Sequence, residues 1–187
     1  MNVLQNLYME KPKFLAWVRA SEGRYELAGS RVVMMTGGSR GHAIIMRRLA
    51  TALERRLDGN RWTVLTSDFG VDLGPATVRY PDVVVDVAGG RLADLTATAP
   101  ILVAEVVSPS SATSDLGDKA SEYLRLPGLS AYLVLAQDEI KAWIWVRGAA
   151  GFSPGPNVVE GHDATIEIAA LGIDLPLSEI YAGLETS

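Results

Sequence analysis

Cysteine is absent from this 187-residue chain, and histidine occurs only at His42 and His162. Without thiols the chain has neither disulfides nor thiolate metal sites. Two histidines also argue against a zinc site built on imidazoles. If the protein binds a metal, we therefore expect a hard cation held by oxygen atoms, such as Mg²⁺ or Mn²⁺.

Long apolar runs are also missing. No run approaches the roughly 20 residues that a membrane-spanning helix needs. The first residues, MNVLQNLYMEKPKF, carry charges where a signal peptide would be continuously apolar. The composition, 48% hydrophobic and 21% charged, is typical of a globular chain. We expect a single domain over residues 1–187, located in the cytoplasm and without contact to a membrane.

Positive charge is scarce, since the formal net charge is −5, but it is unevenly distributed. Residues 1–61 contain 11 Lys and Arg against 5 Asp and Glu, whereas the remaining residues contain 6 against 17. Such an asymmetry indicates an interaction face. Arg47, Arg48 and Arg55 are candidates for contacts with nucleic-acid phosphates. The alternative is that these arginines form an ordinary solvated helix surface.

Apolar periodicity predicts a chain that contains both helices and strands. We expect helices at residues 11–20, 41–57, 114–126 and near 177–184. We expect two strands within residues 24–35, around a turn at 29–30, and further strands at 61–73, 77–87, 101–107, 131–136 and 139–146, with weaker strands towards the C-terminus. This order predicts an α/β domain with a central mixed β-sheet flanked by helices.

Two carboxylates stand among apolar strand residues. Glu105 interrupts the run ILVAEVV, and Asp82 directly precedes VVV. A buried, unpaired charge costs several kcal/mol, so such a group is normally paired, bound to metal or protonated. A turn-like pair, Gly89 and Gly90, lies between the two strands, which can therefore bring both carboxylates to one end of the sheet. Such a pair is the minimum for a Mg²⁺ or Mn²⁺ site, and the cation would activate water for attack on a phosphodiester.

A nuclease site also needs a positive group near the developing charge. Lys119, in SDLGDKASEY, is the nearest downstream candidate. On a helix, Asp115, Lys119 and Tyr123 share one stripe at a spacing of four, which can point towards the strand of Glu105. The alternatives are a Glu105 paired with a core arginine, an Asp82 in a strand-entry turn and a solvated Lys119 paired with Asp115.

Six motifs occur in a characteristic order along the chain: RYEL, the helix of His42, RYPDVVV, EVVSPS, a DxxDKxxxY run and LPGLSAYLVL. In this order and spacing they resemble the Uma-two family of restriction endonuclease-like proteins, part of the PD-(D/E)XK nuclease superfamily. The resemblance covers nearly the whole chain. It implies a restriction-endonuclease-like core, here with an extra N-terminal hairpin and C-terminal strands, and a metal-dependent endonuclease acting on DNA.

The resemblance also implies roles for individual residues. Asp82 is similar to the superfamily's Pro-Asp metal ligand and Glu105 to its second acidic ligand, and a main-chain carbonyl near Val106 would be a further ligand. The superfamily's basic pattern has a lysine two places after the second acid, where this chain has Val107. The family is thought to use a lysine from the following helix instead, and Lys119 matches that position.

Two further residues match family positions. Glu26, in YEL, is an additional candidate for the site, and His42 matches a histidine without an assigned role. The alternatives are a hairpin-surface position for Glu26 and a helix-terminal position for His42. The aromatic pair Trp143 and Trp145 alternates along one strand, and an exposed aromatic surface there would suit a homodimer.

Two other functions stay open at the level of sequence. Val107 and the acidic net charge are compatible with a catalytically inactive nuclease fold that binds nucleic acid or a protein partner. A homodimeric accessory protein without metal affinity is the third alternative. For the leading hypothesis, the residues predicted for catalysis are Asp82, Glu105 and Lys119.

Overall fold

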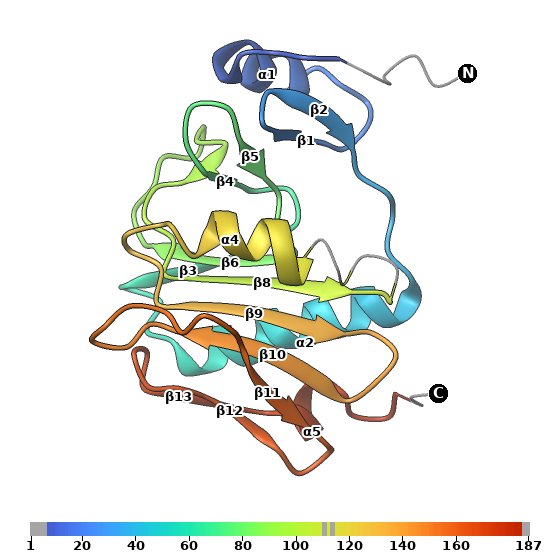
Figure 1. Cartoon of the computed structure of the whole chain (residues 1–187), viewed down its shortest axis with the longest axis vertical. Helices are drawn as coiled ribbons and strands as arrows, with labels where there is room; N and C mark the ends of the chain where they lie inside the picture. The colour runs from blue at the N-terminus through green and yellow to red at the C-terminus, as the bar shows by residue number, and fades with distance from the viewer. Residues whose placement is uncertain (1–6, 110–111, 113–114, 185–187) are drawn as a thin grey trace.

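The structure is a computed structural model that describes residues 7–109, 112 and 115–184. A six-stranded mixed sheet lies at its centre (Figure 1). The strand order is β11-β10-β9-β8-β6-β3, with β8 and β9 parallel and the other neighbouring pairs antiparallel. These strands are β3 (Trp62–Thr66), β6 (Val83–Val87), β8 (Leu102–Val107), β9 (Ala131–Ala136), β10 (Lys141–Val146) and β11 (Asn157–Glu160).

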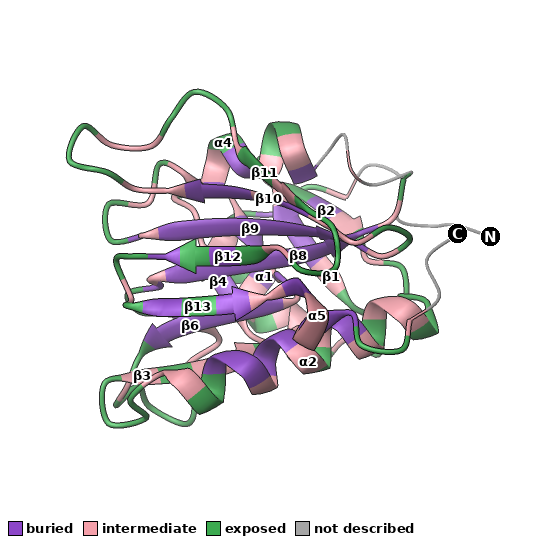
Figure 2. Cartoon of the chain, turned by 90° about the horizontal axis from the view of Figure 1, so that it is seen from below, coloured by how far each residue is buried: buried purple, intermediate pink, exposed green. Residues whose placement is uncertain are grey.

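Each face of this sheet has its own hydrophobic core. One core forms against α2 (Arg40–Arg56), α5 (Leu177–Ile180) and the hairpin of β12 (Thr165–Ile168) and β13 (Ile173–Pro176). The other forms against α4 (Ala120–Tyr123), which continues a π-helical turn, η1 (Asp115–Lys119). The central strands β6, β8 and β9 are almost entirely buried (Figure 2), which explains their continuous apolar sequences.

Strand alternation decides which face Glu105 occupies. Ala104 and Val106 belong to the core beside α2, whereas Val103 and Val107 belong to the core beside α4. Because successive strand residues point to opposite faces, Glu105 lies on the side of α4.

A second, smaller sheet lies beyond α4, towards the N-terminal end of the chain (Figure 1). Its strand order is β2-β1-β5-β4-β7, and helix α1 (Lys11–Val18) packs on it. The strands are β1 (Tyr25–Ala28), β2 (Arg31–Met34), β4 (Gly70–Asp72), β5 (Val78–Arg79) and β7 (Thr96–Ala97). The predicted turn between β1 and β2 is confirmed, with φ of 57° at Gly29 and 67° at Ser30.

The predicted fold class is confirmed, with differences at several boundaries. The strand expected at residues 61–73 divides into β3 and β4, and the strand expected at 77–87 divides into β5 and β6. Pro81 separates β5 from β6 because it has no N–H to donate to a ladder. Asp82 therefore stands at the entry to β6, where the chain passes from one sheet to the other, and not inside a strand.

The predicted helices differ from the observed ones at their ends. α1 ends at Val18 and α5 at Ile180, and the helix expected at 114–126 contains the π-helical turn and ends at Tyr123. Ser114, the first residue expected in that helix, lies outside the described residues. None of the helices in the described ranges is long and apolar enough to cross a bilayer.

Candidate active site

A cavity of about 400 Å³ lies near the end of β8, with walls from both the central and the N-terminal sheet. The loop at residues 36–39, the start of α2 and the η1 turn complete the lining. Four carboxylates face this cavity, those of Glu26, Asp82, Glu105 and Asp115, together with Lys119. The three residues predicted for catalysis from the sequence, two acids and one lysine, thus line a single cavity.

Sheet register explains why the two predicted ligands meet. β6 and β8 are antiparallel neighbours, and Val83 pairs with Ala104. One position beyond this pair, Asp82 stands opposite Glu105. The main-chain N–H of Val106 donates a 2.7 Å hydrogen bond to Oδ2 of Asp82, which fixes the aspartate at the end of the ladder.

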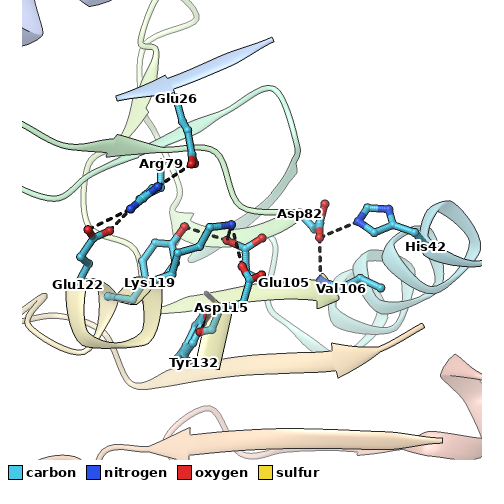
Figure 3. Close-up of polar contacts among 11 residues, drawn as sticks. Glu26, His42, Arg79, Asp82, Glu105, Val106, Asp115, Lys119, Glu122 and Tyr132 are labelled. Carbon is cyan, nitrogen blue, oxygen red and sulfur yellow. Dashed lines mark hydrogen bonds and ion pairs between the residues drawn. The ribbon is translucent and has the colours of Figure 1, made fainter. Parts of the chain in front are cut away.

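His42 holds the same oxygen of Asp82 from α2 (Figure 3). Its Nε2 lies 3.0 Å from Oδ2 of Asp82. The histidine stands in the first turn of α2, where its main-chain N–H donates to the capping hydroxyl of Ser39. The hydrogen bond with Asp82 raises the pKa of His42, although burial acts in the opposite direction. This contact places the histidine, which had no predicted role, directly beside the aspartate.

Glu105 is buried, with only 6% of its side chain exposed, and one of its oxygens has two donors. Oε1 accepts from Nζ of Lys119 at 3.2 Å and from the hydroxyl of Tyr123 at 3.1 Å. Burial raises the pKa of Glu105 to about 8; Lys119 acts against this shift, whereas the charges of Asp82 and Asp115 add to it. Even with Lys119 beside it, the carboxyl group therefore stays largely protonated at neutral pH, and it needs a further positive charge in order to ionise.

Lys119 supplies positive charge to two acids at once. Its Nζ lies 2.7 Å from Oδ1 of Asp115 as well as 3.2 Å from Oε1 of Glu105 (Figure 3). Burial on its own lowers the pKa of Lys119, but the neighbouring charges of Glu105 and Asp115 raise it above its usual value. Lys119 thus makes the pair with Asp115 that the alternative expected, but it is mostly buried at the site and not solvated.

The η1 turn is held in place by an aromatic stack on the central sheet. The hydroxyl of Tyr132 donates to the main-chain oxygen of Asp115 at 3.0 Å. The Tyr132 ring lies between Tyr123, at 5.1 Å between centroids, and Trp145, at 5.5 Å. Trp145 is therefore buried in this aromatic stack and offers no surface for a dimer contact. The homodimer stays a prediction.

Glu26 lines the cavity, but its carboxylate is paired with an arginine that the sequence did not reveal. Nη1 of Arg79 donates to Oε1 of Glu26 at 2.6 Å. The same guanidinium donates to both oxygens of Glu122, at 2.8 and 3.0 Å. Arg79 thus links β1 of the N-terminal sheet to α4, next to Lys119 (Figure 3). Glu26 is buried in this network and does not lie on the hairpin surface.

The donor set fits a hard divalent cation. Within the described part of the chain, Oδ1 of Asp82 and Oε2 of Glu105 accept no hydrogen bond, so each carboxylate keeps one oxygen for a further partner. No three histidine, aspartate or glutamate side chains in the described ranges gather closely enough to hold a metal by themselves. Mg²⁺ is commonly bound by one or two carboxylates together with waters and substrate oxygens, which matches two carboxylates and a main-chain carbonyl such as that of Val106.

The arginines predicted to contact phosphates lie away from the cavity. Arg48 donates to the main-chain oxygens of Ile180 and Ala182 and so anchors the C-terminal segment. Arg47 and Arg55 are exposed on α2, and neither lines the cavity. Their role in nucleic-acid binding stays a prediction.

Arg24, which the sequence analysis did not single out, does reach the cavity. Its guanidinium donates to the main-chain oxygen of Ser67 at 2.9 Å, and about half of the side chain is exposed. A lone arginine ahead of a short strand carries no sequence signal that would have identified it. The loop at residues 36–39 was also missed, although its TGGS sequence directly precedes a capped helix.

Gly38 in this loop allows the contact between His42 and Asp82. A Cβ at Gly38 would lie 2.5 Å from Nδ1 of His42, a distance that real contacts do not tolerate. Glycine therefore lets the loop pass against the imidazole ring. Ser39 then closes the loop on the central sheet, since its hydroxyl donates to Oε1 of Gln137 at 2.9 Å.

Comparison with known proteins identifies relatives over nearly the whole chain. The Uma2 family, described as "Putative restriction endonuclease", matches residues 12–178. An uncharacterized protein of Synechocystis sp. (strain ATCC 27184 / PCC 6803 / Kazusa) is 27% identical over 176 residues, which cover 92% of this chain and 90% of that protein. A second uncharacterized protein of the same organism is 27% identical over 116 residues, covering 60% of this chain and 66% of the other.

A solved structure shares the fold. The crystal structure of a "putative nuclease belonging to DUF820" from Anabaena variabilis ATCC 29413 superposes with a TM-score of 0.71 at 13% sequence identity. The match covers 87% of this chain and 92% of the other. This chain therefore shares its mixed α/β fold with that protein.

Proposed function

Because this chain belongs to the Uma2 family, we propose that it is a metal-dependent endonuclease that hydrolyses phosphodiester bonds in DNA. The observation that supports the proposal best is the pairing of Asp82 and Glu105 at one cavity. Each of these carboxylates has one oxygen fixed by protein donors and the other free of them among the described contacts. A hard cation in the cavity would be coordinated by these two remaining oxygens.

In this proposal Asp82, Glu105 and the main-chain carbonyl of Val106 hold Mg²⁺ or Mn²⁺. When bound, the cation polarises a phosphoryl oxygen and lowers the pKa of water at the site. Protein groups keep the two acids oriented: the amide of Val106 and the ring of His42 for Asp82, and the hydroxyl of Tyr123 for Glu105. Donors of this kind are needed because ligating carboxylates are normally held by hydrogen bonds of their own.

Lys119 would act on the reacting phosphate. Its ammonium group is held by Asp115 and Glu105 at the wall of the cavity, where it can orient the attacking water or stabilise the negative charge of the transition state. Removal of one such group typically costs about 10²–10³ in rate. The lysine reaches this position from the helix after β8, although Val107 occupies the place where the superfamily pattern has lysine.

Binding without cleavage is the second candidate, and one observation favours it. Lys119 already donates a hydrogen bond to Glu105, so the acid has a protein partner even without a metal. A nuclease fold that only binds nucleic acid or a protein partner would retain the same contacts.

A plasmid-nicking assay with Mg²⁺ or Mn²⁺ separates the two candidates. The variants are Asp82→Asn and Glu105→Gln, and the matched controls are Asp174→Asn and Glu167→Gln, whose side chains are exposed on the C-terminal hairpin. All proteins are purified in parallel, so that a contaminating nuclease appears in every sample. We expect the wild type and controls to nick in a chelator-sensitive manner and the two site variants to lose at least about 100-fold in rate.

Two results would contradict the proposal. Site variants that nick as fast as the wild type would assign the activity to a contaminant or to another site. A wild-type protein that binds DNA but does not nick it with either metal would be a DNA-binding protein with a nuclease fold.

A further inference from the structure

A second cavity, of about 200 Å³, lies beside the acidic one. Arg24, Met35 and Tyr80 line both cavities, so the two share a wall. Tyr80 stands two residues before Asp82 in the chain. The second cavity is therefore directly adjacent to the proposed metal site.

The chemistry of the second cavity suits a flat ring. Tyr25 and Tyr80 supply aromatic surface, Leu95 supplies apolar surface, and Ser67 and Arg24 provide polar groups at the lining. Its volume is below the roughly 300 Å³ at which sites for drug-sized ligands begin, so it has room for a single ring system and not for a whole nucleotide.

Tyr80 is the most unusual member of this lining. Its phenol lines both cavities. Among the described contacts, this hydroxyl has no hydrogen-bond partner. It is thus available to a ligand that offers hydrogen-bonding groups on the edge of a ring.

The space beside Tyr25 is kept open by the local chain. The Tyr25 ring packs against Trp17, with centroids 4.8 Å apart, which fixes its orientation. A Cβ at Gly23 would lie 2.7 Å from the hydroxyl of Tyr25, so only glycine leaves that position free. The aromatic wall is therefore preformed.

We propose that the second cavity binds an unpaired nucleobase whose adjacent phosphate lies at the site of Asp82 and Glu105. This inference rests on the nuclease function proposed above and defines its substrate class as single-stranded or locally unpaired nucleic acid. A base inside a duplex is stacked on both faces and cannot enter such a cavity unless it leaves the helix. Proteins that bind single strands use aromatic side chains as stacking surfaces in the same way.

Arg24 connects the two cavities. Its side chain lines both, and it is 46% exposed although one N–H is donated to the oxygen of Ser67. Its Nε also lies 3.6 Å from Oδ1 of the exposed Asp68. In the proposed complex the remaining N–H groups of Arg24 contact the phosphate between the base and the acidic cavity. Such phosphate contacts position the strand without reading its sequence.

Fluorescence of 2-aminopurine tests the proposal, because this base changes its emission when it enters or leaves a stack. Three oligonucleotides of one sequence are compared in Ca²⁺: a single strand, its full duplex, and a duplex with the 2-aminopurine as a single-base bulge. The variants are Tyr80→Leu, which removes the ring, and Tyr80→Phe, which keeps it. Tyr8→Leu is the matched control, since Tyr8 is exposed and lines neither cavity.

We expect the single strand and the bulge to bind at least about fivefold more tightly than the duplex, because each stacked base adds that much or more. Tyr80→Leu should remove this preference and the fluorescence change, whereas Tyr8→Leu should retain both. Tyr80→Phe should retain the fluorescence change but bind more weakly, because it keeps the ring and loses the hydroxyl. Leu95→Trp should also remove them, because it fills the cavity without altering Tyr80. Thermal denaturation of each variant excludes loss of fold as the cause.

Equal affinity for duplex and single strand, or an unchanged fluorescence response in folded Tyr80→Leu and Leu95→Trp, would overturn the inference. Nicking that depends on Asp82 would then leave the nuclease proposal standing. Conversely, a protein without metal-dependent nicking that still shows the Tyr80-dependent response would retain the base-binding cavity and lose the nuclease function.

Discussion

The amide of Val106 and the carboxylate of Asp82, 24 positions apart in the chain, are joined by a 2.7 Å hydrogen bond. The bond spans the two central strands β8 and β6 at the point where Glu105 lies opposite Asp82. The two acids are therefore held on a rigid part of the fold, as a site that acts on a charged substrate requires.

Replacement of Lys119 should separate catalysis from metal binding. In Lys119→Met we expect the rate of DNA nicking to fall by about 10²–10³, because the group that faces the transition-state charge is lost. Mn²⁺ binding should persist, since loss of a positive charge does not weaken the attraction between carboxylates and cation. Nicking and calorimetry on the same samples measure both effects.

The control for this prediction is Lys13→Met, which removes an exposed lysine from α1. Lys119→Arg keeps a positive charge near Glu105. Comparison with this variant shows whether the lower nicking rate of Lys119→Met follows from loss of the fold. Full activity in a folded Lys119→Met protein would remove the lysine from the mechanism.

Glu105 should destabilise the metal-free protein at alkaline pH. Its pKa in the folded state is about 8, above the ordinary value of 4.5, so the folded state binds this proton more tightly than the unfolded state. The resulting stabilisation is fully present below the ordinary value and is lost as the pH rises through 8. Glu105→Gln removes this titration.

In the absence of metal, we expect Glu105→Gln to raise the Tm above that of the wild type by at least about 2 °C at alkaline pH. The difference should shrink as the pH falls towards the ordinary value of 4.5. Melting curves across the pH range check this, with Glu167→Gln on the exposed face of β12 as the control. A Glu105→Gln protein that melts below the wild type at alkaline pH would contradict the burial cost assigned to this carboxylate.

Gly38→Ala should damage the site without touching an acid. The added Cβ would lie 2.5 Å from the His42 ring, which must move and so loses its contact with Asp82. We expect Mn²⁺ affinity to fall about 10–100-fold, the usual effect when a hydrogen-bond partner of a metal ligand is lost. Titration calorimetry measures it.

Gly37→Ala is the matched control, because a Cβ there meets nothing within 4 Å. His42→Ala should reproduce the effect of Gly38→Ala, and the double variant should be no worse than either single one. Additive losses would show that Gly38 acts through something other than His42.

Arg79 should matter mainly for stability. Arg79→Met leaves the buried Glu26 and its neighbour Glu122 without their cation, so we expect a loss of about 3–5 kcal/mol in the free energy of unfolding. Arg91→Met, at an exposed pair with Asp94, should have a much smaller effect, because solvent screens this pair. Denaturant titration measures both. An Arg79→Met protein as stable as the wild type would show that this network contributes little to holding α4.

The sequence allowed the main acidic residues and the lysine to be predicted because each carries a local signal. Glu105 interrupts an apolar strand, and Lys119 shares a helical stripe with Asp115 and Tyr123. The structure confirms that these four side chains lie together. Their catalytic and metal-binding roles stay predictions.

Other parts of the site depend on contacts between distant segments and left no local pattern. Arg79 meets Glu26 across 53 positions and Glu122 across 43, and His42 meets Asp82 across 40. The division of one predicted strand at Pro81 also depended on tertiary structure, since a proline can equally stand at a strand edge. That division is what places Asp82 between the two sheets.

Calorimetric titration of Mn²⁺ into the wild type, Asp82→Ala and Glu105→Ala tests the central claim most directly. We expect Mn²⁺ to bind the wild type and neither variant, while thermal denaturation shows that all three proteins are folded. A wild-type protein that binds no Mn²⁺, or variants that bind it as tightly as the wild type, would contradict a metal site at Asp82 and Glu105.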